Sequence, residues 1–228
     1  MGWWIWDPTY VLILPALFFA IYAQSQVRGA FEKYSKQRAA SGYRGVEVAR
    51  SLLQAAGLDD VHVERTSQPL GDHYDPRAGV VRLSPQVYQG DSVAALGIAA
   101  HEVGHVMQHH TGYVPLNMRN NLVPIAGLGS SAAFPLFFMG FFFNSQSLMD
   151  VGIILFGLAV LFHVMTLPVE RNASTRALAL LEARGFITSQ ETVPVRRVLN
   201  AASLTYLAAT AMAVLQLLRL LVLRGHRR

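Results

Sequence analysis

The pentapeptide His101-Glu102-Val103-Gly104-His105 has the residue types and the spacing of a zinc-binding helix. Two imidazoles four residues apart lie on one face of a helix, about 6 Å apart along its axis. That spacing allows both rings to bind one zinc ion, and the glutamate between them can reach a water held by the metal. We therefore predict that His101 and His105 are zinc ligands and that Glu102 is the general base of a hydrolase.

The pattern H-E-x-x-H also occurs by chance in unrelated proteins, so its surroundings matter. Here an apolar run leads into the motif, and Gly104 within it is small. The longer metzincin pattern is excluded, because it requires Gly and His where this chain has Gln108 and Thr111. His109 continues the face of His105, but three imidazoles in a straight row cannot converge on a tetrahedral ion. We expect His109 and His110 at the helix end, where they stabilise the helix dipole.

The composition indicates a membrane protein. Of the 228 residues, 52% are hydrophobic and only 14% are charged. There is no cysteine, which excludes disulfides, thiolate zinc ligands and a cysteine nucleophile. The formal net charge is +5, and the basic residues border apolar stretches. This distribution favours an anionic membrane surface over nucleic acid as the partner of the positive charge.

Four apolar stretches predict about four transmembrane helices. The first has no charge from Pro8 to Val27, and Trp3, Trp4 and Trp6 before it suit an interfacial belt. A cleaved signal peptide is the weaker alternative, because a basic n-region and a small-residue cleavage site are missing. The predicted segments are an N-terminal transmembrane helix (1–27), a metalloprotease domain (28–121), a transmembrane hairpin (122–168), a third-ligand helix region (169–200), and a C-terminal transmembrane helix with a basic tail (201–228).

The metalloprotease domain shows a short alternating strand at 61–65 and a second strand at 80–84, separated by a turn-rich stretch. A small sheet before an H-E-x-x-H helix is the usual protease arrangement. An edge strand can hold an extended peptide by main-chain hydrogen bonds, and we expect the substrate to lie against a strand such as Val80 to Leu83.

The distribution of basic residues predicts the orientation. Residues 28–121 carry ten Lys and Arg residues and residues 169–200 carry five, whereas the segment before the first span and the hairpin 144–149 carry none. The positive-inside rule therefore predicts both polar segments in the cytoplasm. Four spans would leave the basic C-terminal tail outside. The last helix therefore crosses against the rule, lies in the interface or turns back.

The predicted topology also indicates the third ligand. A catalytic zinc site keeps three protein ligands and one open position. Two spans that form a hairpin leave and return on one side, so the residues after Pro168 come back next to the zinc helix. Glu170 is the first acid there, and its carboxylate suits zinc. The alternative is an exposed carboxylate at a helix start, favoured by the dipole.

Three further residues have weaker predicted roles. His163 lies one or two turns before Glu170, and is either a buried, hydrogen-bonded histidine or a partner that orients a ligand. His73 and Arg176 are candidate donors to the oxyanion of the transition state. For His73 an ordinary loop residue is the more frequent alternative.

Four segments together carry a family resemblance: Asp72 to Arg77, Val81 to Ser84, Ala100 to Gln108, and Leu167 to Ser174. They resemble the bacterial YugP-like family of neutral zinc metallopeptidases, which are membrane proteins. More distantly, the chain is similar to membrane gluzincins of the HtpX and CAAX-protease type. Those enzymes place a zinc-binding glutamate after a transmembrane hairpin, and they degrade membrane or prenylated proteins.

The resemblance implies the ligand set His101, His105 and Glu170. The wider group usually has an aspartate four residues after the ligand glutamate, where it orients a histidine. Here that position is Ser174, so the orienting contact is expected from Ser174 or from Asn172.

We therefore expect a mainly α membrane protein with about four transmembrane helices and a small α+β, zincin-like domain on the cytoplasmic side of the bacterial inner membrane. The expected activity is zinc-dependent endopeptidase cleavage of membrane or membrane-proximal proteins. Zn²⁺ is the expected cofactor, and a peptide or membrane-protein substrate and the lipid bilayer are the expected partners. An oligomer or a partner membrane protein stays open. The alternative is an inactive or structural zinc-binding scaffold, but a structural site would have a fourth protein ligand.

Overall fold

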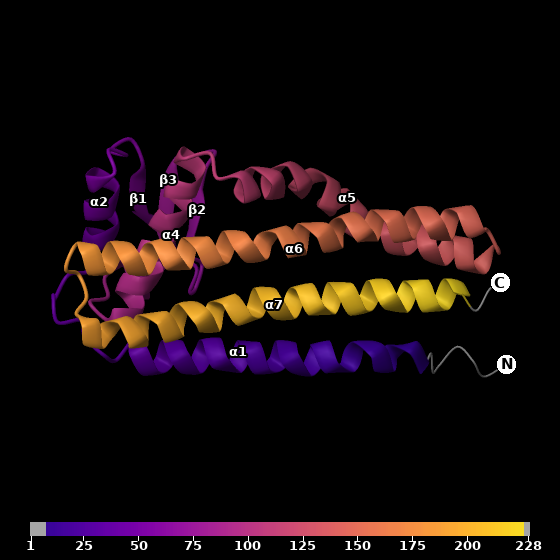
Figure 1. Cartoon of the computed structure of the whole chain (residues 1–228), viewed down its shortest axis with the longest axis horizontal. Coiled ribbons are helices and arrows are strands. Elements are labelled where there is room, and N and C mark those ends of the chain that lie inside the picture. The colour runs from indigo at the N-terminus through magenta and orange to yellow at the C-terminus, as the bar shows by residue number, and fades with distance from the viewer. Residues whose placement is uncertain (1–7, 226–228) are drawn as a thin grey trace. The chain divides into compact units, whose positions relative to one another are not determined.

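The computed structural model of the chain describes residues 8–225 and is shown in Figure 1. The predicted interfacial residues Trp3, Trp4 and Trp6, and the basic residues Arg227 and Arg228, lie outside these residues. The elements in chain order are η1 (Pro8–Ile13), α1 (Leu14–Tyr34), α2 (Gly45–Ala55), β1 (His62–Arg65), β2 (His73–Asp75), β3 (Val80–Leu83), α3 (Pro85–Tyr88), α4 (Val93–His110), α5 (Val114–Phe142), α6 (Gln146–Ala183) and α7 (Ser189–Gly225). The predicted fold class, mainly helical with a small α+β region, is confirmed.

Four helical segments of the described chain are long and apolar enough to cross a membrane: Pro8–Tyr34, Val114–Phe142, Gln146–Ala183 and Ser189–Gly225. This finding confirms the predicted number of spans. The helices extend beyond the predicted apolar stretches, and the third span and the third-ligand helix are one continuous helix, α6. Pro168 lies inside it. A proline removes one main-chain hydrogen bond of a helix. The helix nevertheless continues on both sides of Pro168.

The chain forms two compact units. Unit 1 comprises the described parts of 1–24, 115–168 and 204–228, and unit 2 comprises residues 25–114 and 169–203. In unit 1, helices α5 and α6 approach closely at glycines. A Cβ added at Gly129 would meet the carbonyl oxygen of Leu155 at 2.5 Å, and one added at Gly152 would meet that of Ala133 at 2.7 Å. Small residues that let backbones approach are typical of helix packing in membranes.

The basic residues near the end of α7 have partners within unit 1. Arg219 is buried, its guanidinium lies 3.7 Å from the ring centroid of Tyr10, and its Nε donates to the hydroxyl of Thr9. Arg224 donates from Nη2 to Oδ2 of Asp150 over 2.8 Å. Such pairing lowers the free-energy cost of basic residues on a helix that is long and apolar enough to cross a membrane.

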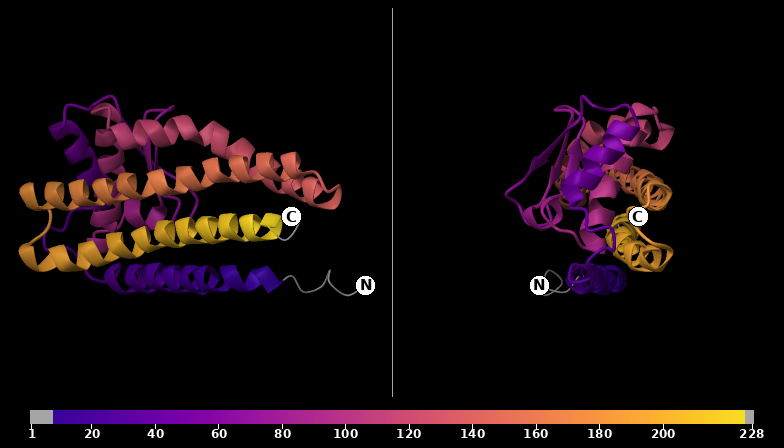
Figure 2. Two further views of the ribbon diagram at one scale, coloured as in Figure 1. Left: turned by 45° about the vertical axis from the view of Figure 1, so that its right-hand side comes forward. Right: turned by 90° about the vertical axis from the view of Figure 1, so that its left-hand side faces the viewer.

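Unit 2 contains a three-stranded sheet in the order β1-β3-β2. The three strands lie together beside α2 and α4 (Figures 1 and 2). Strand β3 is central, parallel to β1 and antiparallel to β2, so its main chain is paired on both sides. The prediction that a substrate lies against Val80 to Leu83 is therefore wrong. The edge strand in contact with α4 is β2, which is only three residues long and was hidden in a turn-rich stretch.

The hydrophobic core of unit 2 holds α4 in place. Alternate residues of β3, Val81 and Leu83, point into this core, whereas Arg82 between them does not. Leu96, Val103 and other apolar residues of α4 are fully buried in the same cluster. The alternation of a strand and the periodicity of a helix thus place one face of α4 against the sheet.

Candidate metal centre

Helix α4 positions His101, Glu102 and His105. Ser92 caps its N-terminus, where the hydroxyl accepts a hydrogen bond from the main-chain N–H of Ala95 over 3.2 Å. Such caps satisfy a donor that the helix leaves unpaired. The two imidazoles lie one turn apart with ring centroids 4.7 Å from each other. The predicted helix and the predicted shared face of its histidines are confirmed.

Gly104 allows α6 to approach the motif. A Cβ at this position would meet the carbonyl oxygen of Ala173 at 2.8 Å and its Cα at 3.2 Å. The small residue inside the pentapeptide is therefore required by close packing of two helices. Ala173 is itself fully buried, so little room is left for either main chain to shift.

Helix α6 brings Glu170 to the two histidines. Its Oε2 lies 3.3 Å from Nε2 of His101 and 3.6 Å from Nε2 of His105. One ligand atom from each residue lies within 4.8 Å of the others. Three donors that converge in this way can hold one cation. The structure thus brings together the three residues predicted as ligands.

Glu102 lies beside this cluster and is 7% exposed. Burial raises the pKa of its carboxyl above the ordinary value; the nearby histidines oppose this rise, and the negative charges of Asp72 and Glu170 add to it. A raised pKa makes a carboxylate a better proton acceptor. The position of Glu102 beside the three donors is the placement that a general base requires.

Each imidazole has a hydrogen-bond partner at its second nitrogen. The hydroxyl of Ser174 lies 3.2 Å from Nδ1 of His101, and the amide oxygen of Gln108 lies 3.0 Å from Nδ1 of His105. Such contacts fix the orientation of metal-binding histidines. Ser174 makes this contact from the position at which the wider group of similar enzymes usually has an aspartate.

Gln108 was not predicted as part of the site. Its Nε2 donates to the carbonyl of Val169 over 2.8 Å and to Oδ1 of Asn172 over 3.0 Å. Asn172 also accepts a hydrogen bond from Nε of Arg176 over 2.8 Å. Asn172 thus reaches His105 through Gln108, while Arg176 is engaged with Asn172. The role of Arg176 as an oxyanion donor stays a prediction.

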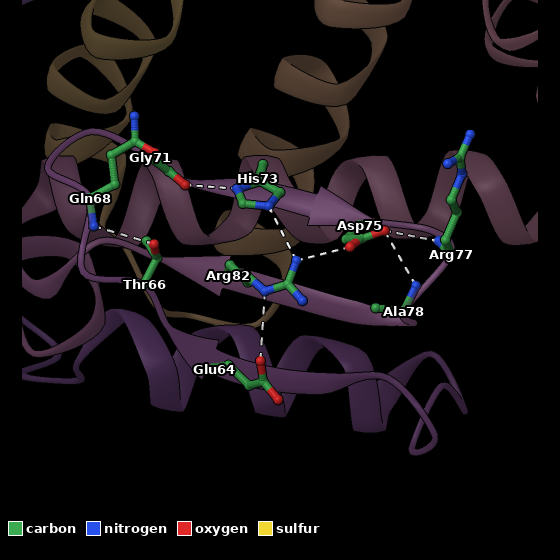
Figure 3. Close-up of polar contacts among 9 residues, drawn as sticks. All are labelled: Glu64, Thr66, Gln68, Gly71, His73, Asp75, Arg77, Ala78 and Arg82. Atoms are coloured by element: carbon green, nitrogen blue, oxygen red, sulfur yellow. Dashed lines mark hydrogen bonds and ion pairs between the residues drawn. The ribbon is translucent and has the colours of Figure 1, made fainter.

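His73 lies in a different polar cluster, which Figure 3 shows. Its Nδ1 is 2.8 Å from the carbonyl oxygen of Gly71, and its Nε2 is 3.5 Å from a guanidinium nitrogen of Arg82. Arg82 also pairs with Asp75 at 2.9 Å and with Glu64 at 3.7 Å. The structure does not place His73 among the three convergent donors, and its role as a transition-state donor stays a prediction.

Tyr74 and Asp72, which flank His73 in the chain, have polar contacts outside the cluster of Figure 3. Tyr74 lies between His73 and Asp75 on β2, and its hydroxyl is 3.1 Å from Nδ1 of His109. Asp72 accepts hydrogen bonds from the main-chain N–H and the hydroxyl of Ser84, over 2.7 and 3.0 Å. Burial raises the pKa of the Asp72 carboxyl, although these bonds oppose the rise. Three residues are too few to show the alternation of a strand, so the sequence carried no clear signal that separated Tyr74 from its neighbours.

His163 belongs to unit 1. Its main-chain carbonyl accepts a hydrogen bond from the hydroxyl of Thr210 over 3.3 Å, and its ring packs against Phe162. Neither contact is a hydrogen bond of the imidazole, so the predicted alternative of a buried, hydrogen-bonded histidine stays a prediction. A role for His163 in orienting a ligand stays a prediction.

The donor set fits zinc. Two imidazole nitrogens and one carboxylate oxygen are common ligands of catalytic zinc, and three protein ligands leave a position for water. The described residues group only His101, His105 and Glu170 in this way. The alternative, a structural site, would need a fourth protein ligand, and among the described residues no further His or acidic side chain joins this group.

Comparison with known proteins identifies the family. A family model described as "putative neutral zinc metallopeptidase" matches residues 9–225. The chain belongs to this family. It is also 45% identical over 212 residues to "Putative membrane protease YugP" of Bacillus subtilis (strain 168), covering 93% of this chain and 94% of that protein. No solved structure matches the chain.

The family membership supports a peptidase that uses zinc, and the relative and the four apolar helices support a membrane protein. All the residues of the candidate metal centre lie within the matched range. The family description and the convergent ligand geometry therefore agree on the kind of chemistry.

Proposed function

We propose that this protein is a membrane-embedded zinc endopeptidase that cleaves membrane or membrane-proximal proteins. The observation that carries the proposal is the convergence of His101, His105 and Glu170 beside the buried carboxylate of Glu102. A structural scaffold has no need for a buried general base next to an incomplete ligand set. The comparison proteins support the same class of activity.

A zinc ion bound by these ligands would supply Lewis acidity and lower the pKa of a bound water toward about 7. Glu102 then accepts a proton from the attacking water and donates it to the leaving amine. His101 and His105 present their Nε2 atoms to the centre because Ser174 and Gln108 occupy their Nδ1 atoms. Each residue of the site has one task in this scheme.

We place the substrate along the outer edge of β2. This strand is at the edge of the sheet and contacts α4, and its inward residue Tyr74 reaches the last turn of the zinc helix. An extended peptide can add to such an edge by main-chain hydrogen bonds. A peptide bound in this way is extended next to α4, and an internal peptide bond of it can be cleaved, as in an endopeptidase.

The orientation stays a proposal: unit 2 in the cytoplasm, and the protein in the bacterial inner membrane. The absence of cysteine makes a single introduced thiol a clean probe. Gln54→Cys, an exposed position in unit 2, should resist a membrane-impermeant maleimide in intact cells. Ser147→Cys, exposed near the start of α6, should be labelled. The reverse labelling pattern would invert the proposed orientation.

The activity is tested with Glu102→Gln, which keeps the shape of the side chain but cannot accept the proton. We expect full zinc content by elemental analysis and complete loss of cleavage. Membrane proteomes of cells that carry the wild type or the variant are compared for fragments that vanish with the variant, which identifies substrates. Fragments that persist with Glu102→Gln would sink the proposed mechanism.

A further inference from the structure

Gln108 is a polar side chain with no exposure to solvent, and it contacts both ligand-bearing helices. It lies on α4, three residues after His105, and therefore on the same helix face. Its amide group has partners on α4 and on α6. A buried amide costs free energy unless it is hydrogen-bonded, and this one is satisfied at both ends.

The partners determine how the amide is oriented. The carbonyl oxygen of Val169 can only accept, so the group 2.8 Å away must be the amide nitrogen of Gln108. The oxygen of the amide therefore faces Nδ1 of His105 at 3.0 Å. Because that oxygen can only accept, Nδ1 of His105 carries the proton and donates it.

This hydrogen bond leaves Nε2 of His105 with its lone pair. Nε2 is the atom that faces Oε2 of Glu170 at 3.6 Å. A neutral histidine protonated on Nδ1 presents Nε2 as a metal ligand. Gln108 thus selects the form of His105 that can bind a metal.

The amide nitrogen acts on the other helix. Val169 precedes Glu170 directly, and Asn172 follows it by two residues, so the two acceptors flank the third ligand. The bond to the carbonyl of Val169 holds the α6 main chain next to Glu170, and the bond to Oδ1 of Asn172 holds a neighbouring side chain. The side chain of Gln108 therefore holds His105 and the segment around Glu170 in a fixed position relative to each other.

We propose that Gln108 is a positioning residue of the metal centre, which sets the orientation of His105 and the placement of Glu170 together. The inference rests on the proposed zinc site, and it goes beyond that proposal because it assigns to one amide the coupling of His105 to the segment that carries Glu170. At His101 the corresponding contact at Nδ1 comes from Ser174, which lies on α6 itself.

The test measures the metal and not the activity. Gln108→Met keeps the length of the side chain but removes both the acceptor and the donors. Gln108→Glu keeps an acceptor for His105 but cannot donate to Val169 or Asn172. The matched control is Gln54→Met, a glutamine exposed on α2 in the same unit. Each purified full-length protein is titrated with zinc against a chelating dye, and the visible spectrum of the cobalt-loaded form is recorded.

We expect both Gln108 variants to bind zinc about 10–100-fold more weakly, which is the usual range for contacts that orient a ligand. Their cobalt spectra should differ from the wild-type spectrum, because the ligand geometry changes. Gln54→Met should match the wild type in both. A residue that only stabilises the fold would lower the melting temperature of the metal-free protein and leave the zinc affinity and the cobalt spectrum of the folded protein unchanged.

A wild-type zinc affinity and spectrum for Gln108→Met would overturn the inference. Should that variant fail to fold, Asn172→Ala decides, because it removes one acceptor and leaves Gln108 in place. It should weaken zinc binding in the same direction by a smaller factor, and an unchanged affinity and spectrum would overturn the inference equally. Failure of the peptidase proposal shows separately, as an active Glu102→Gln variant.

Discussion

Unit 2 carries two clusters of charged and histidine residues that differ in burial and in their central group. The metal centre joins His101, His105 and Glu170, and the side chain of Glu170 is 5% exposed. The sheet cluster joins Glu64, Asp75, His73 and Arg82, with Arg82 31% and Glu64 55% exposed. In the sheet cluster the guanidinium of Arg82 takes the central position. The metal centre contains three electron-pair donors, and among the described residues no Lys or Arg forms an ion pair with its carboxylate.

The difference teaches how a metal site is distinguished from an ordinary ion-pair network. A cluster with its own cation satisfies its carboxylates and has no need of a metal. Buried donors without a cation carry a desolvation cost that a bound metal ion offsets. Burial, and the absence of a paired Lys or Arg among the described residues, therefore mark the site more than the number of acidic residues does.

The largest expected effect comes from Glu170→Ala. Loss of one of three ligands should lower the zinc affinity by more than the roughly 100-fold that marks the upper range for orienting contacts. Zinc content after purification is the measurement, and Glu64→Ala in the sheet cluster is the matched control. Equal zinc contents in the two variants would remove the distinction between the clusters.

Removal of the metal should have the next largest effect. A ligand that binds only the folded state at a concentration 1,000 times its Kd stabilises that state by about 4 kcal/mol. The melting temperature of the wild-type protein in detergent should therefore fall after chelation, whereas that of Glu170→Ala should not respond. A response of the same size in both proteins would show that the chelator acts elsewhere.

Gly104→Ala should have an intermediate effect. The added methyl group would meet the carbonyl oxygen of Ala173 at 2.8 Å, and overpacking of this kind costs about 1–3 kcal/mol. Gly29→Ala is the control, since a Cβ at that position of α1 meets nothing within 4 Å. The measurements are the melting temperature and the zinc content. A harmless Gly104→Ala would mean that α4 and α6 can separate without loss of the site.

The sequence predicted the parts of the site that follow from local pattern and topology. The spacing of His101 and His105 is a property of one helix, and Glu170 followed from the return of a hairpin to one side of a membrane. Four apolar stretches predicted the four long helices. These features depend on periodicity and on hydrophobicity, which a single sequence displays directly.

The parts that were missed depend on contacts between distant segments. The role of Gln108 depends on its hydrogen bonds to Val169 and Asn172, which follow it by 61 and 64 residues in the chain. A local sequence pattern does not show such contacts. β2 was hidden because three residues are too few to show an alternation. The expected substrate strand was wrong for the same reason, since an undetected β2 made β3 look like an edge.

The smallest expected effect concerns the sheet cluster. The hydrogen bond from Arg82, supported by main-chain bonds from Ala78 and Arg77, holds the pKa of Asp75 below its ordinary value of 3.8. A lowered pKa in the folded protein means that Asp75 contributes stability above pH 3.8, and that this contribution is lost as the pH falls through the folded-state pKa. Asp75→Asn should therefore lower the melting temperature slightly at pH 7. The difference from the wild type should disappear in strong acid, where both proteins carry a neutral side chain.

The zinc content of Asp75→Asn should stay at the wild-type level, because the Asp75 carboxylate belongs to a network in which Arg82 already supplies the positive charge. Loss of zinc from Asp75→Asn would mean that the two clusters act as one.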